Sequence, residues 1–198
     1  MSEGASTAIV CDTTAYLPDE LIAEYGIRTV SLYVTLDGEQ RRESEISPAE
    51  YETFYERLRR SEQGATTSQP SVGDFIEVYA PLLEQGREIV SLHLSGAISG
   101  TYESARRARQ QLIDEGRGGE RIHVYDSRSA CGGTGLCVLA AARAAARGAD
   151  AEEALAAAQR VRDELRMWFA VDTLEYLRKG GRIGAARALL GSALQIKP

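Results

Sequence analysis

The chain has 198 residues, which suits one large domain or two small ones and is long enough for a substantial hydrophobic core. Its 43% hydrophobic and 26% charged content is ordinary for a globular protein, and no apolar run approaches the ~18 residues that a membrane-spanning helix needs. The formal net charge is −6, and basic residues are dispersed among acidic ones, which argues against nucleic-acid binding.

The first half of the chain alternates between strand and helix patterns. The predicted strands are residues 7–11 (TAIVC) and 27–36 (IRTVSLYVTL), the second followed by a hairpin turn at Asp37-Gly38. Three helices are predicted. The first covers residues 18–25 (PDELIAEY), and the second starts at the capping box 47–50 (SPAE) and runs to about Arg60. The third covers residues 75–85 (FIEVYAPLLEQ) and is capped by Ser71. Pro81 should kink or divide the last of these. Residues 62–66 are predicted to form a loop, and Pro70 excludes helix directly before it.

The second half continues the same alternation. The predicted strands are residues 88–94 (EIVSLHL), 121–125 (RIHVY) and 167–171 (MWFAV). The predicted helices are residues 101–113, an Ala-rich stretch ending at Arg147, a second Ala-rich helix from 150 to about 165, one or two turns at 172–177, and 185–194. This alternation predicts an α/β fold with a parallel sheet flanked by helices.

Ligands of parallel α/β sheets bind at the carboxyl ends of the strands. Three hydroxyl-rich clusters lie at or near such ends: residues 12–14 (DTT), 66–68 (TTS) and 95–101 (SGAISGT), with Ser127 and Ser129 as a candidate fourth. Residues 95–101 also precede a helix, whose first N–H groups and dipole favour an anion. The clusters offer neutral donors rather than bases, which suits holding an anion more than breaking a bond.

Other chemistries have little support in the sequence. The run 132–135 (GGTG) does not match GxGxxG, and GxxxxGK[ST] does not occur, so we expect these glycines to allow close helix–strand packing. The three cysteines, Cys11, Cys131 and Cys137, include no CxxC pair, and the two histidines lie in predicted strands. We therefore expect no metal site, cofactor or Ser-His-Asp triad. The first ten residues carry no basic region or long apolar segment, so a cytoplasmic location is expected.

Six motifs, in order along nearly the whole chain, resemble the DegV family, which includes the fatty-acid-binding subunits (FakB) of bacterial fatty acid kinase. They are residues 12–18 (DTTAYLP), 66–71 (TTSQPS), 95–105 (SGAISGTYESA), 126–130 (DSRSA), 172–184 (DTLEYLRKGGRIG) and 195–198 (QIKP).

The resemblance implies a two-domain α/β protein that buries a long-chain fatty acid between its domains. It implies that Thr67 and Ser95 hold the carboxylate. From their place in the hydroxyl-rich clusters, we expect Thr66, Ser68 and Thr101 to shape the turns first and to line the site second, and Thr14 and Asp12 are further candidates for lining it. The resemblance also implies a carrier, without catalytic residues or a cofactor, whose bound carboxylate is phosphorylated by a partner fatty acid kinase. The basic loop with Arg178 and Arg182 is implied to dock that kinase or to contact a membrane surface transiently. Asp12 and Thr14 could equally serve as structural hydrogen-bond partners.

The sequence departs from the family pattern in two places. Gly96 and Ala97 replace the family's second serine and its following glycine, while Ser95 is retained. Family members also continue well beyond the IKP motif, into a region where some carry a histidine that helps to hold the carboxylate. We therefore expect an N-terminal domain at residues 1–165 and only the beginning of a second, smaller α/β domain at 166–198.

Two alternatives to a fatty-acid carrier stay open. One is a hydrolase or transferase that acts on a small acyl or phosphorylated substrate, with Ser95 as the nucleophile. Against it, GxSxG is absent and no histidine is placed to activate Ser95. The other is a shortened protein that serves only as an interaction module.

Overall fold

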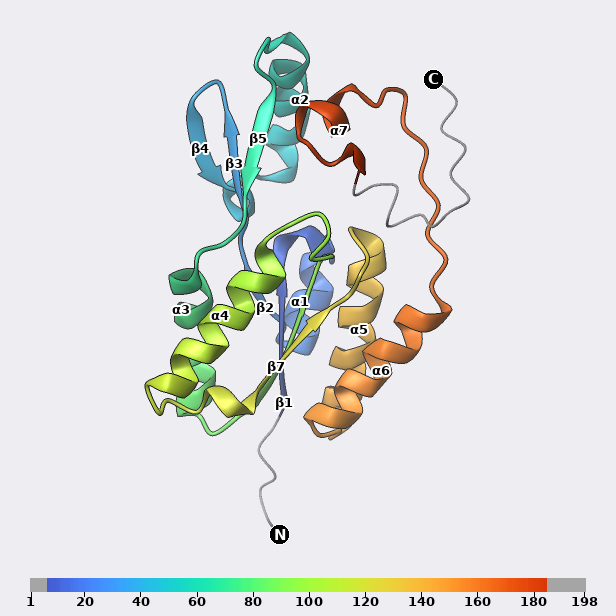
Figure 1. Cartoon of the computed structure of the whole chain (residues 1–198). Helices are drawn as coiled ribbons and strands as arrows, with labels where there is room; N and C mark the ends of the chain where they lie inside the picture. Colours follow the sequence, from blue (N-terminus) through green and yellow to red (C-terminus); the bar gives the residue numbers. More distant parts are fainter. Residues whose placement is uncertain (1–6, 185–198) are drawn as a thin grey trace. The chain divides into compact units, whose positions relative to one another are not determined.

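The structure of the chain is a computed structural model that describes residues 7–184 (Figure 1). It divides into two compact units, one made of residues up to Ser31 together with Gln69–Leu165, the other of Leu32–Ser68 together with the residues from Arg166. The second unit thus includes a segment that the sequence analysis assigned to the N-terminal domain. The division into domains 1–165 and 166–198 stays a prediction. The helix expected at 185–194 lies outside the described residues.

The first unit is built on a four-stranded parallel sheet in the order β2-β1-β6-β7. Its strands are β1 (Thr7–Asp12), β2 (Arg28–Val30), β6 (Glu88–His93) and β7 (Ile122–Asp126). All six residues of β1 are buried, as expected for a central strand covered on both faces. The predicted α/β fold with a helix-flanked parallel sheet is confirmed.

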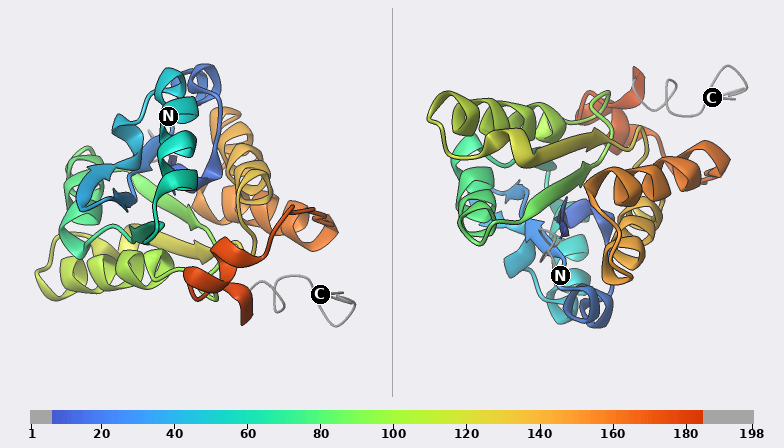
Figure 2. Two further views of the ribbon diagram at one scale, coloured as in Figure 1. Left: turned by 90° about the horizontal axis from the view of Figure 1, so that it is seen from above. Right: turned by 90° about the horizontal axis from the view of Figure 1, so that it is seen from below.

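Helices cover both faces of this sheet (Figures 1 and 2). The helices of this unit are α1 (Asp19–Tyr25), α3 (Val72–Glu84), α4 (Thr101–Asp114), α5 (Gly132–Ala146) and α6 (Ala151–Glu164). Ala8 and Val10 of β1 pack into a cluster with α3 and α4, whereas Ile9 and Cys11 pack into a second cluster with α5 and α6. This alternation follows from the two-residue period of a strand. Pro81 lies inside α3 and does not divide it.

The glycine-rich start of α5 permits close packing. A Cβ atom on Gly135 would lie 2.5 Å from the carbonyl oxygen of Ala15, in the short 3-10 helix η1 (Thr13–Ala15) that follows β1. A Cβ on Gly133 would likewise overlap the Ser129 hydroxyl. The GGTG run thus permits close packing as expected, but at these two glycines α5 approaches the turns after β1 and β7 and not a strand.

The second unit contains a small antiparallel sheet in the order β4-β3-β5. Its strands are β3 (Tyr33–Leu36), β4 (Glu39–Arg42) and β5 (Ala65–Ser68), and it also holds helices α2 (Tyr51–Arg60) and α7 (Glu175–Lys179). The predicted hairpin turn is confirmed, because Asp37 and Gly38 have φ angles of 52° and 82°, as a two-residue turn between antiparallel strands requires.

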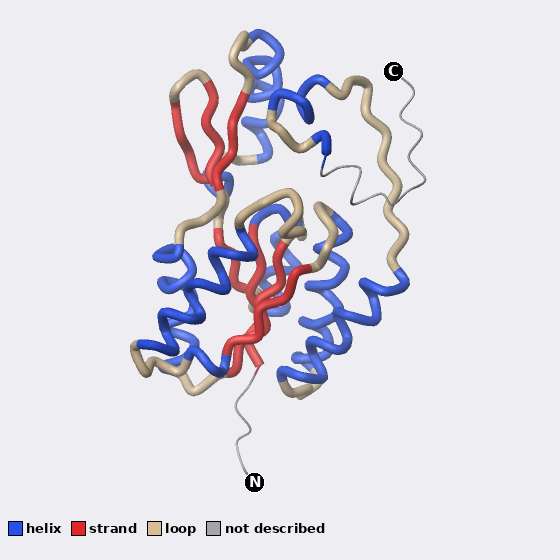
Figure 3. Tube along the Cα trace, in the orientation of Figure 1, coloured by secondary structure: helices blue, strands red, loops and turns tan. Residues whose placement is uncertain are grey.

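Three predictions about strands were wrong. The run 27–36 is not one strand, because the chain passes at Ser31-Leu32 from the first unit to the second, and the run contributes β2 and β3 to different sheets. No strand was predicted at residues 65–68, the first two of which were assigned to a loop, but these residues form β5 because they pair with β3. Residues 167–171 form no strand and are drawn as loop in Figure 3. Trp168 in this segment is 91% exposed.

Candidate ligand-binding site

The first candidate region is the carboxyl edge of the parallel sheet, where β1, β6 and β7 end. Asp12 is the last residue of β1, and His93 is the last residue of β6. The register pairs Cys11 with Leu92 and His93 with Asp126, so these three strands end at nearly the same level. The turns that follow each strand therefore start from one edge of the sheet.

A chain of hydrogen bonds between buried side chains runs along this edge. The Tyr79 hydroxyl of α3 lies 2.7 Å from Ser91 Oγ, which lies 2.7 Å from His93 Nε2. His93 Nδ1 lies 3.0 Å from Asp12 Oδ2. All four side chains are buried, and the Phe75 ring packs edge-on against the His93 ring with a centroid separation of 5.0 Å. This series of hydrogen bonds therefore joins α3, β6 and β1 within the core.

Asp12 is a buried carboxylate with several internal donors. Its Oδ2 accepts from the Leu94 N–H at 3.1 Å as well as from His93, and its Oδ1 accepts from the N–H and the hydroxyl of Thr14. Burial would raise the pKa of Asp12, but the hydrogen bonds from His93, Thr14 and Leu94 outweigh it and hold the pKa below its ordinary value. Of the two roles considered for Asp12 and Thr14, this geometry favours the structural one. Their role as ligand contacts stays a prediction.

Ser95 begins the turn between β6 and α4. Its N–H donates to the Ser129 carbonyl at 2.8 Å, and its carbonyl accepts from the N–H groups of Ile98 and Ser99. Its Oγ accepts from the Ala97 N–H at 3.2 Å. Among the hydrogen bonds of the described residues, none uses the hydroxyl hydrogen of Ser95, which leaves that hydrogen available for an acceptor. Four hydrogen bonds made by the backbone and Oγ of Ser95 hold the residue in place, and it is 2% exposed.

Thr101 is the first residue of α4 and is buried. Its hydroxyl lies 2.9 Å from Ser99 Oγ, and its N–H donates to the same oxygen. Gly100, which precedes the helix, provides no side-chain cap. The Ser99–Thr101 pair thus shapes the start of α4, and a direct ligand contact for Thr101 stays a prediction.

The candidate fourth cluster lies in the turn after β7. Ser127 Oγ lies 3.0 Å from the Thr134 hydroxyl and accepts from the Ser129 N–H, and the Ser127 N–H donates to the His93 carbonyl. The Ser129 hydroxyl is buried and has no hydrogen-bond partner among the described residues. This turn is therefore bonded both to the end of β6 and to Ser95.

The remaining predicted contacts lie in the second unit. Thr66, Thr67 and Ser68 are exposed residues of β5, so they follow no parallel strand, and the expectation that they lie at the carboxyl end of one is wrong. Arg178 is an exposed residue near the end of α7. The Arg182 Nη1 donates to the Gly180 carbonyl at 2.6 Å. No group of His, Cys, Asp or Glu side chains in residues 7–184 is arranged to hold a metal ion.

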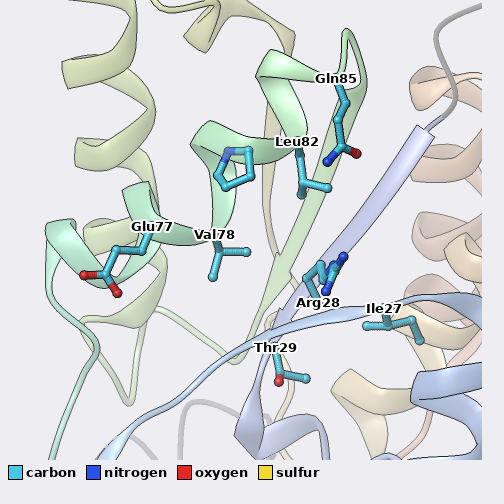
Figure 4. Close-up of a pocket in the computed structure, with 8 residues that line it drawn as sticks. Ile27, Arg28, Thr29, Glu77, Val78, Leu82 and Gln85 are labelled. Carbon is cyan, nitrogen blue, oxygen red and sulfur yellow. The ribbon is translucent and has the colours of Figure 1, made fainter.

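A cavity of about 380 Å³ in the first unit lies away from these residues (Figure 4). It opens between the start of β2 and the second half of α3. It is lined by Ile27, Arg28, Thr29, Glu77, Val78, Pro81, Leu82 and Gln85. None of the predicted site residues is in this lining, so the cavity supports no role for them.

The link between Asp12 and His93 was not predicted from the sequence. Both histidines were expected in strands, and no Ser-His-Asp triad was expected. The structure does join a carboxylate, an imidazole and a serine, but that serine is the buried Ser91 of the strand, not Ser95. The available signal was the spacing of Ser91 and His93, which puts both on the face of β6 that also holds Ile89.

Fold and site together define an α/β protein whose parallel sheet ends in hydroxyl-bearing turns. The chain belongs to the DegV family, whose model matches residues 6–198. It is 39% identical over 193 residues to a DegV domain-containing protein of Listeria innocua and 34% identical over 192 residues to the DegV protein of Bacillus subtilis. Each comparison covers 96% of this chain, but only 65% and 66% of the two relatives. The chain thus spans about two thirds of their length.

Solved structures of the family superpose closely on this one. A DegV family protein from Thermus thermophilus, described as fatty acid binding, gives a TM-score of 0.81 at 39% identity, covering 96% of this chain and 65% of that one. DegV of Bacillus subtilis, described as a fatty acid binding protein, gives 0.81 at 32% identity, covering 98% and 67%. A stearic-acid-binding protein from Eubacterium ventriosum gives 0.78 at 29% identity, covering 91% and 61%.

Across residues 7–184, none of the helices combines the length and the apolar character that crossing a bilayer requires.

Proposed function

We propose that this protein binds a long-chain fatty acid and that the hydroxyls of Ser95 and Thr67 hold its carboxylate. The observation that carries the proposal is Ser95. Its backbone and Oγ are fixed by internal hydrogen bonds, while its hydroxyl hydrogen is not used by another described residue. The description of several family structures as fatty-acid-binding supports the choice of ligand.

The chemistry of a fatty acid suits such donors. Each CH₂ of the acyl chain that leaves water contributes about 0.8 kcal/mol, which gives affinity without directing the ligand. A carboxylate that loses water without gaining donors is very costly, so a few fixed hydroxyls decide where the head group lies. Thr66, Ser68, Thr101, Thr14 and Asp12 are proposed to shape or line that site.

We further propose that the protein is a cytoplasmic carrier rather than an enzyme. Its partner would be a fatty acid kinase, which phosphorylates the presented carboxylate to an acyl phosphate. Two observations support this. Ser95 has no imidazole partner, since Nε2 of His93 is bonded to Ser91, and Arg178 offers an exposed positive charge for docking a kinase or, transiently, a membrane surface.

Fatty-acid binding is tested directly on the purified chain. Native mass spectrometry should show a co-purifying fatty acid, and titration with hexadecanoate should give one site. Replacing both proposed contacts (Thr67→Ala with Ser95→Ala) removes two hydrogen bonds to a charged group, each worth about 1.5–3 kcal/mol, so affinity should fall by more than about 100-fold.

The matched control is Thr29→Ala with Ser61→Ala, which removes the same two side-chain types from residues outside the proposed site. It should bind hexadecanoate as the unmodified chain does. An unmodified chain that is consistently empty, or equal affinities for the two double variants, would contradict the proposal. Labelling of Ser95 by a fluorophosphonate would replace it with the alternative of a serine hydrolase or transferase.

A further inference from the structure

His93 is a buried histidine that the proposed carboxylate contacts do not use. Both of its ring nitrogens are engaged, Nδ1 with Asp12 at 3.0 Å and Nε2 with Ser91 at 2.7 Å. A buried imidazole needs a partner at each ring nitrogen, and for His93 one of the two partners is a buried carboxylate. These two bonds fix the orientation of the His93 ring between Asp12 and Ser91.

The Asp12 partner assigns the direction of the first hydrogen bond. A carboxylate only accepts, so Nδ1 of His93 carries a proton. In the neutral imidazole, Nε2 then accepts from the Ser91 hydroxyl, and Ser91 Oγ accepts from the Tyr79 hydroxyl. Burial raises the pKa of Tyr79, so its hydroxyl keeps its proton in the core.

This direction matters because the series of hydrogen bonds ends at Asp12. Asp12 Oδ2 accepts from His93 Nδ1 and also from the N–H of Leu94, the residue directly before Ser95. The backbone on the other side is held as well, since the His93 carbonyl accepts from the Ser127 N–H and the Ser95 N–H donates to the Ser129 carbonyl. The orientation of one carboxylate oxygen therefore sets the backbone that enters the Ser95 turn.

We propose that Asp12 and the Nδ1-protonated imidazole of His93 form a positioning pair for Ser95, an inference that rests on the proposed role of Ser95 as a carboxylate contact. His93 orients Asp12, and Asp12 fixes the Leu94 N–H, so that the Ser95 hydroxyl is presented in one place. This role requires no contact between either residue and the ligand. The Asp12 carboxylate selects the imidazole tautomer, and the Ser91 hydroxyl, which contacts Tyr79 in turn, is the partner of Nε2.

The tautomer is measured first, because it needs no ligand. The chain has two histidines, so a long-range nitrogen–proton correlation spectrum of the labelled protein contains two imidazoles, and His123→Gln assigns them. We expect the proton of His93 on Nδ1. A proton on Nε2 would overturn the proposal, because Asp12 would then have no imidazole donor.

Two variants separate positioning from packing. The amide nitrogen of Asn can replace Nδ1, so His93→Asn retains a donor to Asp12, whereas the amide of Gln reaches the place of Nε2, so His93→Gln retains a partner only for Ser91. Positioning predicts hexadecanoate affinity within about threefold of the unmodified chain for His93→Asn and roughly tenfold weaker for His93→Gln. Packing predicts the reverse order, since Asn is smaller and leaves the larger cavity.

Hexadecanol provides the readout that a merely structural role would not produce. It has the same tail but no carboxylate, so positioning predicts that its affinity changes by less than about threefold in either variant. Equal losses for hexadecanoate and hexadecanol, or the packing order of the two variants, would overturn the proposal.

If the unmodified chain binds no hexadecanoate, the proposed function fails, and the pair is judged on the backbone. Exchange of the Ser95 amide hydrogen should then be faster in His93→Gln than in His93→Asn. Equal exchange rates would overturn the proposal.

Discussion

Two hydroxyl-bearing regions of this protein differ in what their side chains do. At the carboxyl edge of the parallel sheet, the polar groups are buried and bonded to one another, from Tyr79 through His93 to Asp12. On β5 of the antiparallel sheet, Thr66, Thr67 and Ser68 are exposed, and within residues 7–184 only their backbone is paired, with β3.

The difference separates two requirements of a binding site, a fixed position of the side chain and hydrogen-bonding capacity that is left for the ligand. Groups that share hydrogen bonds in the core hold a backbone in place but have little capacity left for a ligand. Exposed hydroxyls keep that capacity but are not fixed by neighbours. Ser95 combines both features, because its residue is anchored and its hydroxyl hydrogen is unused by the described residues. Four measurements test this contrast, from the largest expected effect to the smallest.

The largest effect is expected from Asp12→Ala. The change leaves the donors of His93, Leu94 and Thr14 without an acceptor in the core, so the free energy of unfolding should fall by about 3 kcal/mol or more. Guanidinium denaturation measures it. The matched control is Asp126→Ala at the end of the neighbouring strand β7, where a cost below about 1 kcal/mol is expected. Equal costs would show that Asp12 is no more integrated than an ordinary turn residue.

A second effect is the pH dependence that Asp12 contributes. Its pKa in the folded state lies below the ordinary value of about 3.9 for the unfolded chain, so its contribution is present above that value and is lost as pH falls through the folded pKa. The stability of the unmodified chain should therefore decline more steeply than that of Asp12→Asn, by at most about 1.4 kcal/mol per pH unit. Denaturation curves from about pH 5 to about pH 2 test this. Parallel profiles would contradict the depressed pKa.

A third test concerns the packing that holds α5 against the end of β1. Gly135→Ala places a methyl group 2.5 Å from the Ala15 carbonyl oxygen, which should cost about 1–3 kcal/mol of unfolding free energy. Gly132→Ala is the control, because a Cβ there meets nothing within 4 Å. It should be neutral or slightly stabilising. Equal thermal midpoints for the two variants would refute the close approach of α5.

The smallest effects compare one hydroxyl from each region. Thr101→Val removes a buried hydroxyl and leaves Ser99 Oγ without that partner, so a loss of about 1 kcal/mol is expected. Thr67→Val acts on an exposed strand residue and should change stability by less than about 0.5 kcal/mol. Urea denaturation of both variants provides the comparison. A larger loss for Thr67→Val would mean that β5 is not exposed in solution.

Local patterns predicted much of the first unit. The apolar runs at β1, β6 and β7 and the capping residues Ser71 and Asp150 each depend on neighbours in sequence, and each lies where expected. The turn at Ser95 and the packing glycine at Gly135 could also be predicted, because small residues between a strand and a helix favour tight turns and close packing.

The errors lie where a partner is distant in sequence. Residues 66–68 are polar and give no strand pattern, yet they pair with β3. Residues 167–171 have a strand pattern but pair with no strand among the described residues. The role of His93 was missed for the same reason. Its histidine-to-carboxylate bond joins residues that are 81 positions apart, and no local pattern reports such a pair.

That separation also constrains how the chain folds. β1 pairs with β2 on one side and with β6 on the other. The second unit's segment Leu32–Ser68 lies between β2 and β6 in the sequence, so it is synthesised before β6. During synthesis the His93 and Leu94 donors of Asp12 are therefore made only after Leu32–Ser68, and closure of this long loop is entropically slow. Until β6 is made, the donors within reach of the Asp12 carboxylate are water and its near neighbour Thr14.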